Sequence, residues 1–130
     1  MPVTTIFRAA LIAVGALALP AHAAPNAIAR TEIENAKPLL IQALNAKDGE
    51  AHGVLVGEMA EAITGHFAAT SPIFIDVTTL KRYRQAGCAR LNVTFWQEGV
   101  RLPETKTPRR QTVEFGINYC LDGLPPKSLQ

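Results

Sequence analysis

The sequence predicts an α+β domain in which two N-terminal helices pack on one face of a three-stranded antiparallel sheet, an ααβββ arrangement. Three observations lead to this fold class. Apolar residues recur at helical spacing as far as residue 69, they alternate with polar residues after Pro72, and two cysteines stand where a disulfide would join neighbouring strands. A chain of 130 residues is long enough for one ordinary domain, which we expect over residues 24–120.

Residues 1–23 have the pattern of a secretory signal peptide. Arg8 precedes an uninterrupted apolar run from Ala9 to Leu19, and Ala21 and Ala23 are small residues of the kind that signal peptidase accepts. The run is shorter than the roughly 20 helical residues that cross a bilayer, which disfavours the alternative of an uncleaved membrane anchor. We therefore expect cleavage after Ala23 and export to the periplasm, with no membrane span in the mature chain.

The first helix is expected to begin at Thr31, because Thr31 and Glu34 have the spacing of a capping box. Apolar residues follow at helical spacing, and Gly49 provides a stop. Pro38 removes one backbone donor inside this segment, so either a kink or a restart of the helix is expected there.

A second helix is expected from about Glu50 to Ala69, where Val56, Met59, Ile63 and Phe67 form one apolar stripe. Three glycines in this segment each weaken a helix by about 1 kcal/mol relative to alanine. Tertiary packing must therefore supply most of its stability.

The three strands are expected at Ile73 to Arg84, Cys88 to Gln97 and Gln111 to Cys120. Glu98 to Arg110 contains two prolines and predicts a long exposed loop. Residues 121–130 predict an extended tail, because two consecutive prolines favour a polyproline II conformation. Such a tail is either frayed or a docking peptide.

The cysteines indicate the register of the last two strands. If Cys88 faces Cys120, Leu91 lies opposite Ile117, and further apolar pairs share that face while polar pairs fall on the other face. A Cys88–Cys120 disulfide suits an oxidising, exported compartment. The alternative of a redox-active pair is disfavoured because the cysteines do not form a Cys-x-x-Cys motif.

The register of the first hairpin follows from its short loop, residues 85–87, which ends in glycine. Centring this hairpin on Ala86 places Thr79 opposite Val93 and Val77 opposite Phe95. Their shared apolar face needs a cover, and the two expected helices are the elements available for it.

Few residues suggest catalysis. No segment has the pattern of a P-loop, a dinucleotide-binding turn, a metalloprotease His pair or a nucleophile elbow. His52 and His66 stand about 21 Å apart along the expected second helix, too far to share one metal or substrate. Asp76 and Glu114 are the best candidates for a glycosidase-like carboxylate pair, across the middle strand. We therefore expect no catalytic residues, no cofactor and no metal.

The face of the sheet opposite the helices is the candidate binding surface, because no segment is left to cover it. A tryptophan beside arginines is typical of protein interfaces. The alternative is an ordinary solvated face with Trp96 packed over Gly116 or over the long loop. The expected partner-binding residues are Arg82, Arg90, Asn92, Thr94, Trp96, Glu114 and Asn118.

The charge pattern favours a protein partner over nucleic acid. The formal net charge of +2 is too small to indicate a polyanion. Between Lys81 and Arg110 basic residues outnumber acidic ones, but they are divided between the first hairpin and the long loop. A nucleic-acid site normally presents one continuous stripe of cations. We therefore expect a monomer that binds an acidic protein surface and no nucleic acid.

Two segments carry a resemblance to a known group of proteins. The run Gly87-Cys88-Ala89-Arg90-Leu91-Asn92-Val93-Thr94-Phe95-Trp96-Gln97, with Asn118-Tyr119-Cys120-Leu121-Asp122-Gly123-Leu124-Pro125-Pro126, resembles small exported accessory proteins of bacterial conjugative transfer (type IV secretion) systems. The resemblance implies a periplasmic, non-enzymatic helper protein. The competing expectation is a small periplasmic hydrolase that acts on cell-wall polymer.

Overall fold

The computed structural model describes Gly15, residues 28–105 and residues 107–130. The predicted signal peptide, apart from Gly15, lies outside the described residues. The elements along the described chain are β1 (Thr31–Ile33), α1 (Lys37–Asn45), β2 (Glu50–Leu55), α2 (Glu58–His66), β3 (Ile73–Arg82), β4 (Cys88–Val100) and β5 (Arg109–Cys120). Within this part of the chain no helix is long and apolar enough to cross a membrane.

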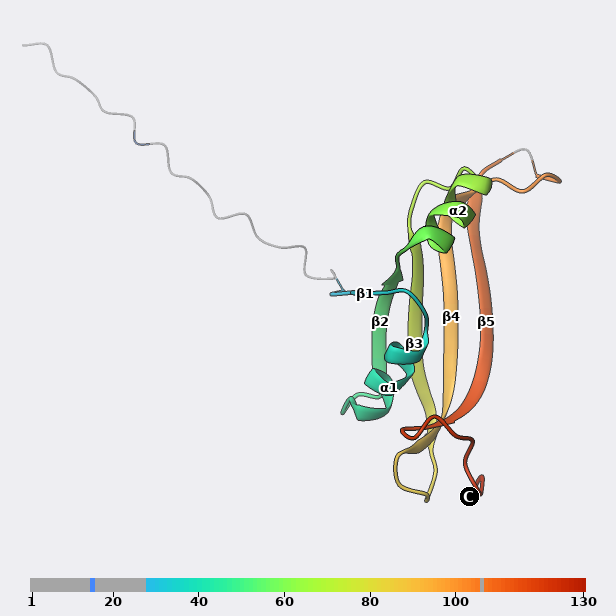
Figure 1. Ribbon diagram of the computed structural model, residues 1–130. Coiled ribbons are helices and arrows are strands. Elements are labelled where there is room, and N and C mark those ends of the chain that lie inside the picture. Colours follow the sequence, from blue (N-terminus) through green and yellow to red (C-terminus); the bar gives the residue numbers. More distant parts are fainter. Residues whose placement is uncertain (1–14, 16–27, 106) are drawn as a thin grey trace, which may run out of the picture.

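The strands form one mixed sheet in the order β1-β2-β3-β4-β5. β1 runs parallel to β2, and the other neighbouring pairs are antiparallel. Both helices lie on the same side of this sheet (Figure 1). The predicted ααβββ arrangement is therefore wrong, because strands alternate with the helices and the sheet has five strands rather than three.

The first departure from the prediction lies before α1. Thr31–Ile33 is not a helical turn but a short strand, in which Thr31 lies opposite Gly53 of β2. The helix begins only at Lys37, and Pro38 stands in its first turn. A proline there removes no intrahelical hydrogen bond, and its fixed φ already suits a helix. Pro38 thus marks the start of the helix, whereas both predicted alternatives, a kink and a restart, assumed a helix that already begins at Thr31.

The second departure concerns Glu50–Leu55, which is a strand rather than the first half of a helix. Gly53 explains part of this difference. A Cβ at Gly53 would lie 3.1 Å from the Thr31 carbonyl oxygen and 3.2 Å from Cδ1 of Leu39. Glycine therefore lets β1 and α1 approach β2 closely. Gly57 then takes a φ of 104°, which L side chains rarely adopt, and separates the strand from α2.

The core lies between α1 and the middle of the sheet. We call the helix-covered side the inner face and the opposite side the outer face. Leu39 and Ala43 of α1 are fully buried, as are Ile75, Val77 and Leu91 on the inner face. Together with their buried neighbours they form one apolar cluster. Burial of this cluster is the main source of stability in a domain of this size.

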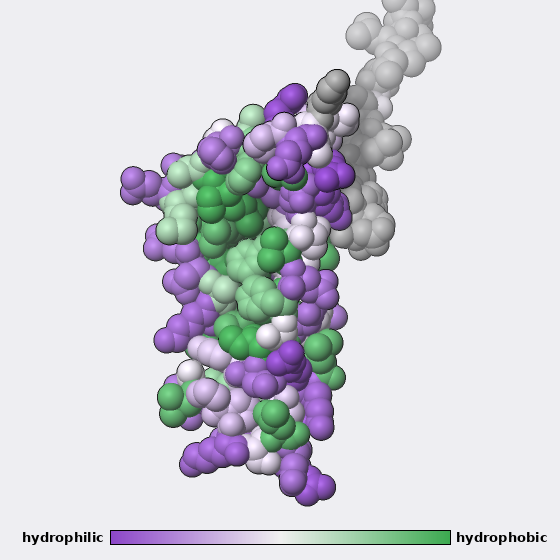
Figure 2. Space-filling view, turned by 90° about the vertical axis from the view of Figure 1, so that its right-hand side faces the viewer, coloured by the Kyte–Doolittle hydropathy of each residue, from purple (hydrophilic) through white to green (hydrophobic). Residues whose placement is uncertain are grey.

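α2 covers the other end of the inner face less completely. Of its residues Ala60 alone is buried. Ile63 of α2 lines an open apolar groove of about 510 Å³ together with Phe95, Val113 and Phe115. Val113 and Phe115 remain 62% and 46% exposed. Figure 2, which faces the β5 edge of the sheet, shows hydrophobic side chains gathered in the upper part of the molecule, toward the α2 end.

The predicted register of the last two strands is confirmed. Cys88 lies opposite Cys120, Leu91 opposite Ile117 and Thr94 opposite Glu114. The cysteines form a disulfide across the pair. The predicted long loop is shorter than expected, because β4 and β5 continue pairing, with an irregularity, as far as Val100 and Arg109.

The predicted register of the first hairpin is wrong by two positions. Val77 lies opposite Val93, and Thr79 lies opposite Leu91 instead of Val93. The turn causes a register shift of one residue. The Tyr83 N–H donates to the Cys88 carbonyl there, so the loop has one residue more than expected. A bulge between Thr79 and Lys81 supplies the second. A shift of one residue moves a side chain to the other face of the sheet, and a second shift moves it back. Val77 therefore still lies on the face where it was predicted.

The last ten residues return to the hairpin that joins β3 to β4. The Leu121 N–H donates to the Gly87 carbonyl, and the Lys127 N–H donates to Oε1 of Gln85. The Gln130 carbonyl accepts from the N–H of Arg84. The tail therefore packs against its own domain along residues 121–130.

Candidate binding site on the outer face of the sheet

Six of the seven predicted binding residues lie on the outer face. Their positions follow from the strand register, which alternates them with the buried inner residues. They are half-buried on β4 and half-buried or exposed on β5. The six are Arg90, Asn92, Thr94, Trp96, Glu114 and Asn118.

Arg82, the seventh predicted residue, lies apart from the others. The bulge in β3 places Arg82 opposite Ala89, a buried inner-face residue, and places Lys81 opposite Arg90 instead. The Arg82 guanidinium donates to the Leu44 carbonyl at 3.1 Å and to the Ala46 carbonyl at 2.8 Å. Cations stabilise the carbonyl end of a helix, so Arg82 anchors the end of α1.

The centre of the outer face is Asp76 on β3, whose carboxylate accepts hydrogen bonds from three sides. Arg30 Nη1 donates to Oδ1 at 2.9 Å, and His52 Nδ1 lies 2.7 Å from the same oxygen. Trp96 Nε1 donates to Oδ2 at 2.7 Å. We call Arg30, His52, Asp76 and Trp96 the Asp76 cluster. Its members come from four different segments and fix one another in place.

The electrostatics of the cluster favour an ionised Asp76. Burial raises the pKa of this carboxyl group. Hydrogen bonds from His52, Trp96 and Arg30, together with the positive charge of Arg30, lower the pKa by more than burial raises it. The net result is a pKa of Asp76 below its ordinary value of 3.8. The Asp76 carboxylate is therefore negatively charged at neutral pH and pairs with the Arg30 guanidinium at 2.9 Å.

Aromatic rings and arginines extend the Asp76 cluster across the sheet. The rings of Phe74 and Trp96 have centroids 4.4 Å apart. Cζ of Arg30 lies 4.7 Å from the Phe74 centroid, and Cζ of Arg110 lies 4.3 Å from the Trp96 centroid. Arg110 also forms an ion pair with Glu98. Because Cζ of Arg30 also lies 5.4 Å from the Trp96 centroid, Trp96 has two guanidinium groups within cation–π distance.

A second polar group occupies the other end of the outer face. A Cβ at Gly116 would lie 2.5 Å from Nη2 of Arg90, so the guanidinium lies directly on the glycine backbone. Asn118 Oδ1 accepts from the Tyr83 hydroxyl at 2.8 Å and from Arg90 Nη1 at 3.3 Å. The expected alternative of Trp96 over Gly116 is therefore wrong, because Arg90 fills that place.

His52 is the best placed acid–base group on this face. Its Nδ1 is oriented by Asp76, and its Nε2 lies 3.5 Å from Oε2 of Glu50. Both ring nitrogens therefore lie beside carboxylate oxygens, from Asp76 on one side and Glu50 on the other. His66 is elsewhere, with its ring packed edge-on against Phe67. Among the described residues no three His, Cys, Asp or Glu side chains form a metal-binding group.

Sequence reasoning missed Arg30, His52, Phe74 and Arg110 as parts of this site. It assigned His52 to a helix, so its pairing with Asp76 across β2 and β3 was not considered. The available signal for a strand was the alternation of Glu50 and His52 with Ala51 and Gly53, followed by the β-branched Val54 and Val56.

Comparison with known proteins gives no relative for this chain: no family model, no curated protein and no solved structure matches. The function must therefore be argued from the site itself.

Proposed function

We propose that this chain is an exported, non-enzymatic accessory protein that binds another envelope protein through the outer face. The observation that carries this proposal is the fixed position of Trp96, whose indole donates to Asp76 and lies between Arg30 and Arg110. Tryptophan and arginine contribute most to binding energy at protein interfaces. Side chains already held in place lose less entropy when a partner binds.

The proposed partner presents acidic side chains. Arg30 is paired with Asp76 and Arg110 with Glu98, while Lys81 and Arg90, opposite each other on β3 and β4, form no ion pair among the described residues. Arginine can bind carboxylates through two parallel hydrogen bonds at a well-defined angle. Most of the binding energy is expected at Trp96, whereas the cations mainly speed association and set orientation.

The disulfide supports the proposed location. Cys88 and Cys120 are oxidised in the structure, and disulfides persist mainly in oxidising compartments such as the periplasm. Export would take place through the signal peptide that the sequence predicts. The resemblance of residues 87–97 and 118–126 to conjugation accessory proteins supports a partner in the envelope part of a conjugative transfer or type IV secretion system.

The experiment that tests this function is site-specific photocrosslinking in bacteria that express the full chain. A photoreactive residue at exposed Thr112, which lies opposite Trp96, should give one discrete adduct with an envelope protein. The same residue at Met59, which is 75% exposed on α2, is the position control. Arg110→Glu should remove the Thr112 adduct, whereas Arg101→Glu, an exposed loop residue, should leave it. Adducts that are equal at both positions, or that survive Arg110→Glu, contradict the proposal.

A periplasmic hydrolase acting on cell-wall polymer is the second candidate, and one observation favours it. Asp76 orients His52 as a carboxylate orients a general base in many hydrolases. Purified protein incubated with peptidoglycan distinguishes the two functions. Release of soluble fragments that His52→Gln abolishes and His66→Gln preserves would replace the binding function with the enzymatic one.

A further inference from the structure

The long edge of the sheet at β5 is a second interaction surface, separate from the Asp76 cluster. β5 is the last strand in the sheet order and has one neighbour, β4, within the described residues. We propose that β5 pairs with β5 of a second copy of this chain, antiparallel and about a two-fold axis at Phe115. One continuous sheet would then run through both copies.

β5 lacks the features that normally protect an edge strand. Proteins discourage edge pairing with short edge strands, prolines, bulges or inward-pointing charges. The opposite edge, β1, has three residues, whereas β5 has twelve. From Gln111 to Cys120 β5 contains no proline, and its pairing with β4 is uninterrupted over this range. Its outer edge therefore offers a long, regular row of backbone donors and acceptors.

The side chains of β5 suit a self-pairing register centred on Phe115. With Phe115 opposite its own copy, Val113 lies opposite Ile117 on the inner face, so each inner pair along the centre is apolar. On the outer face Glu114 lies opposite Gly116. Moving the axis by one residue, to Glu114, would place two like charges opposite each other, which is unfavourable. The register centred on Phe115 avoids that repulsion.

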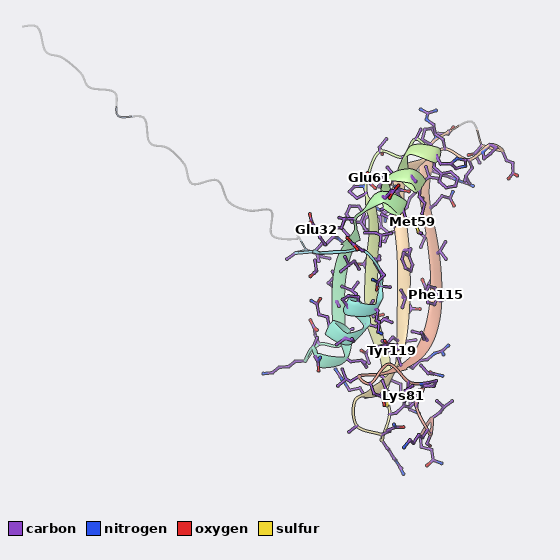
Figure 3. The ribbon with its side chains drawn as sticks, in the orientation of Figure 1. Glu32, Met59, Glu61, Lys81, Phe115 and Tyr119 are labelled. Atoms are coloured by element: carbon purple, nitrogen blue, oxygen red, sulfur yellow. A yellow bond between two sulfur atoms is a disulfide. The ribbon has the colours of Figure 1, made fainter. Side chains whose placement is uncertain are left out.

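The exposed apolar surface lies where this pairing would cover it. Val113 and Phe115 are 62% and 46% exposed and border the groove beside α2. Phe115 projects from the middle of β5 (Figure 3). A stable dimer buries about 1,200–2,000 Å² in total, more than one strand pair alone provides. Each apolar groove borders the proposed seam, so the exposed surface of Val113 and Phe115 would add to the area that the strand pair buries. A second copy fits this surface because an isologous contact repeats the same apolar residues on both sides.

Oxidative crosslinking of the full chain, isolated from the periplasm, tests the proposed register. Residues directly opposite each other have Cα atoms about 4.5–5.5 Å apart, within the span of a disulfide. Phe115→Cys should therefore crosslink to a covalent dimer. Val113→Cys is the matched control, at a more exposed position on the same face, but its two copies would lie about 14 Å apart and should stay monomeric on a denaturing gel. Peptide mass analysis should show the native Cys88–Cys120 bond intact in both variants.

Sedimentation of the unmodified protein, over concentrations into the hundreds of micromolar, tests the association itself. The expected species is a dimer, and Phe115→Lys should weaken it by about tenfold or more because two lysines would face each other at the axis. Circular dichroism checks that the lysine variant still folds. A monomer at every concentration overturns the proposal. So does a dimer that crosslinks at Val113→Cys but not at Phe115→Cys.

Discussion

The two helices cover the same face of the sheet, yet they differ in how completely they bury their residues. Leu39, Leu40, Ala43 and Leu44 of α1 are buried, whereas α2 buries Ala60 alone. Both helices have nine residues. Helix length therefore does not explain the difference. What differs is the number of neighbouring elements fitted around each helix.

The α1 half is closed on both faces of the sheet. On the inner face Gly53 admits the helix, and Arg82 holds its C-terminal carbonyls. On the outer face Arg30, which directly precedes β1, reaches across β2 to Asp76 and to the Gly53 carbonyl. At the α2 end Val113 and Phe115 stay 62% and 46% exposed among the described residues. The fold thus joins a closely packed half to an end with exposed apolar surface.

Truncation in the α1 core gives the largest expected effect. Leu39→Ala should lower the free energy of unfolding by about 3 kcal/mol, because it leaves a cavity at a fully buried site. Met59→Ala on α2, at a residue 75% exposed, should change it by less than about 0.5 kcal/mol. Urea unfolding followed by circular dichroism measures both. Similar losses for the two variants would show that α2 is as well packed as α1.

The pairing of β4 with β5 could be predicted because two features of the sequence, the alternation of apolar residues and the two cysteines, indicate the same register. The two strands alternate over residues 90–95 and 112–119, and the disulfide between Cys88 and Cys120 agrees with the apolar pairing. β1 was not predictable in the same way. It has three residues and pairs in parallel with β2, so tertiary contacts rather than sequence period define it.

The Asp76 cluster was even less accessible to sequence reasoning. Its members lie at positions 30, 52, 76 and 96, and they meet only after the strand order is known. Trp96 was predicted on the correct face because β4 alternates regularly. His52 was not, because helical spacing from Val56 onward was extended back across a strand.

The second prediction concerns the outer face of the α1 half. Asp76→Asn should destabilise the protein by about 2 kcal/mol at neutral pH, because a charged acceptor of three hydrogen bonds is lost. The pKa of Asp76 is lowered on folding, so its ionised form stabilises the fold fully above about pH 3.8. This contribution disappears as the pH falls through the lower folded-state pKa. The difference between wild type and variant should therefore shrink below pH 3.8.

Thermal unfolding across this pH range measures the effect. Glu114→Gln is the control, since Glu114 is an exposed carboxylate on the same face. It should change stability little at any pH in the series. A constant gap between wild type and Asp76→Asn down to the lowest pH would show that Asp76 acts through its shape rather than its charge.

Replacing two of the glycines by alanine should change the free energy of unfolding in opposite directions. Gly53→Ala should destabilise by about 1 kcal/mol, because its Cβ would press on Thr31 and Leu39 at the junction of β1, β2 and α1. Gly65→Ala should stabilise by up to about 1 kcal/mol, because a Cβ there meets nothing within 4 Å and alanine favours the helix. Midpoints of urea unfolding give both values. Stabilisation by both substitutions would mean that β1 and α1 can move away from β2 at little cost.

The smallest expected change in stability concerns Lys81 and Arg82, two neighbouring cations that the bulge in β3 places on opposite faces. Arg82→Gln should cost about 0.5–1 kcal/mol, because the last carbonyls of α1 lose a charged donor. Lys81→Gln should cost less, since Lys81 is exposed and its ammonium lies 5.7 Å from the Tyr83 ring centroid. Hydrogen exchange at the end of α1 provides a local measurement and should quicken in Arg82→Gln alone. Faster exchange there in Lys81→Gln instead would mean that β3 lacks the bulge and that Arg82 faces outward, as the unshifted register predicts.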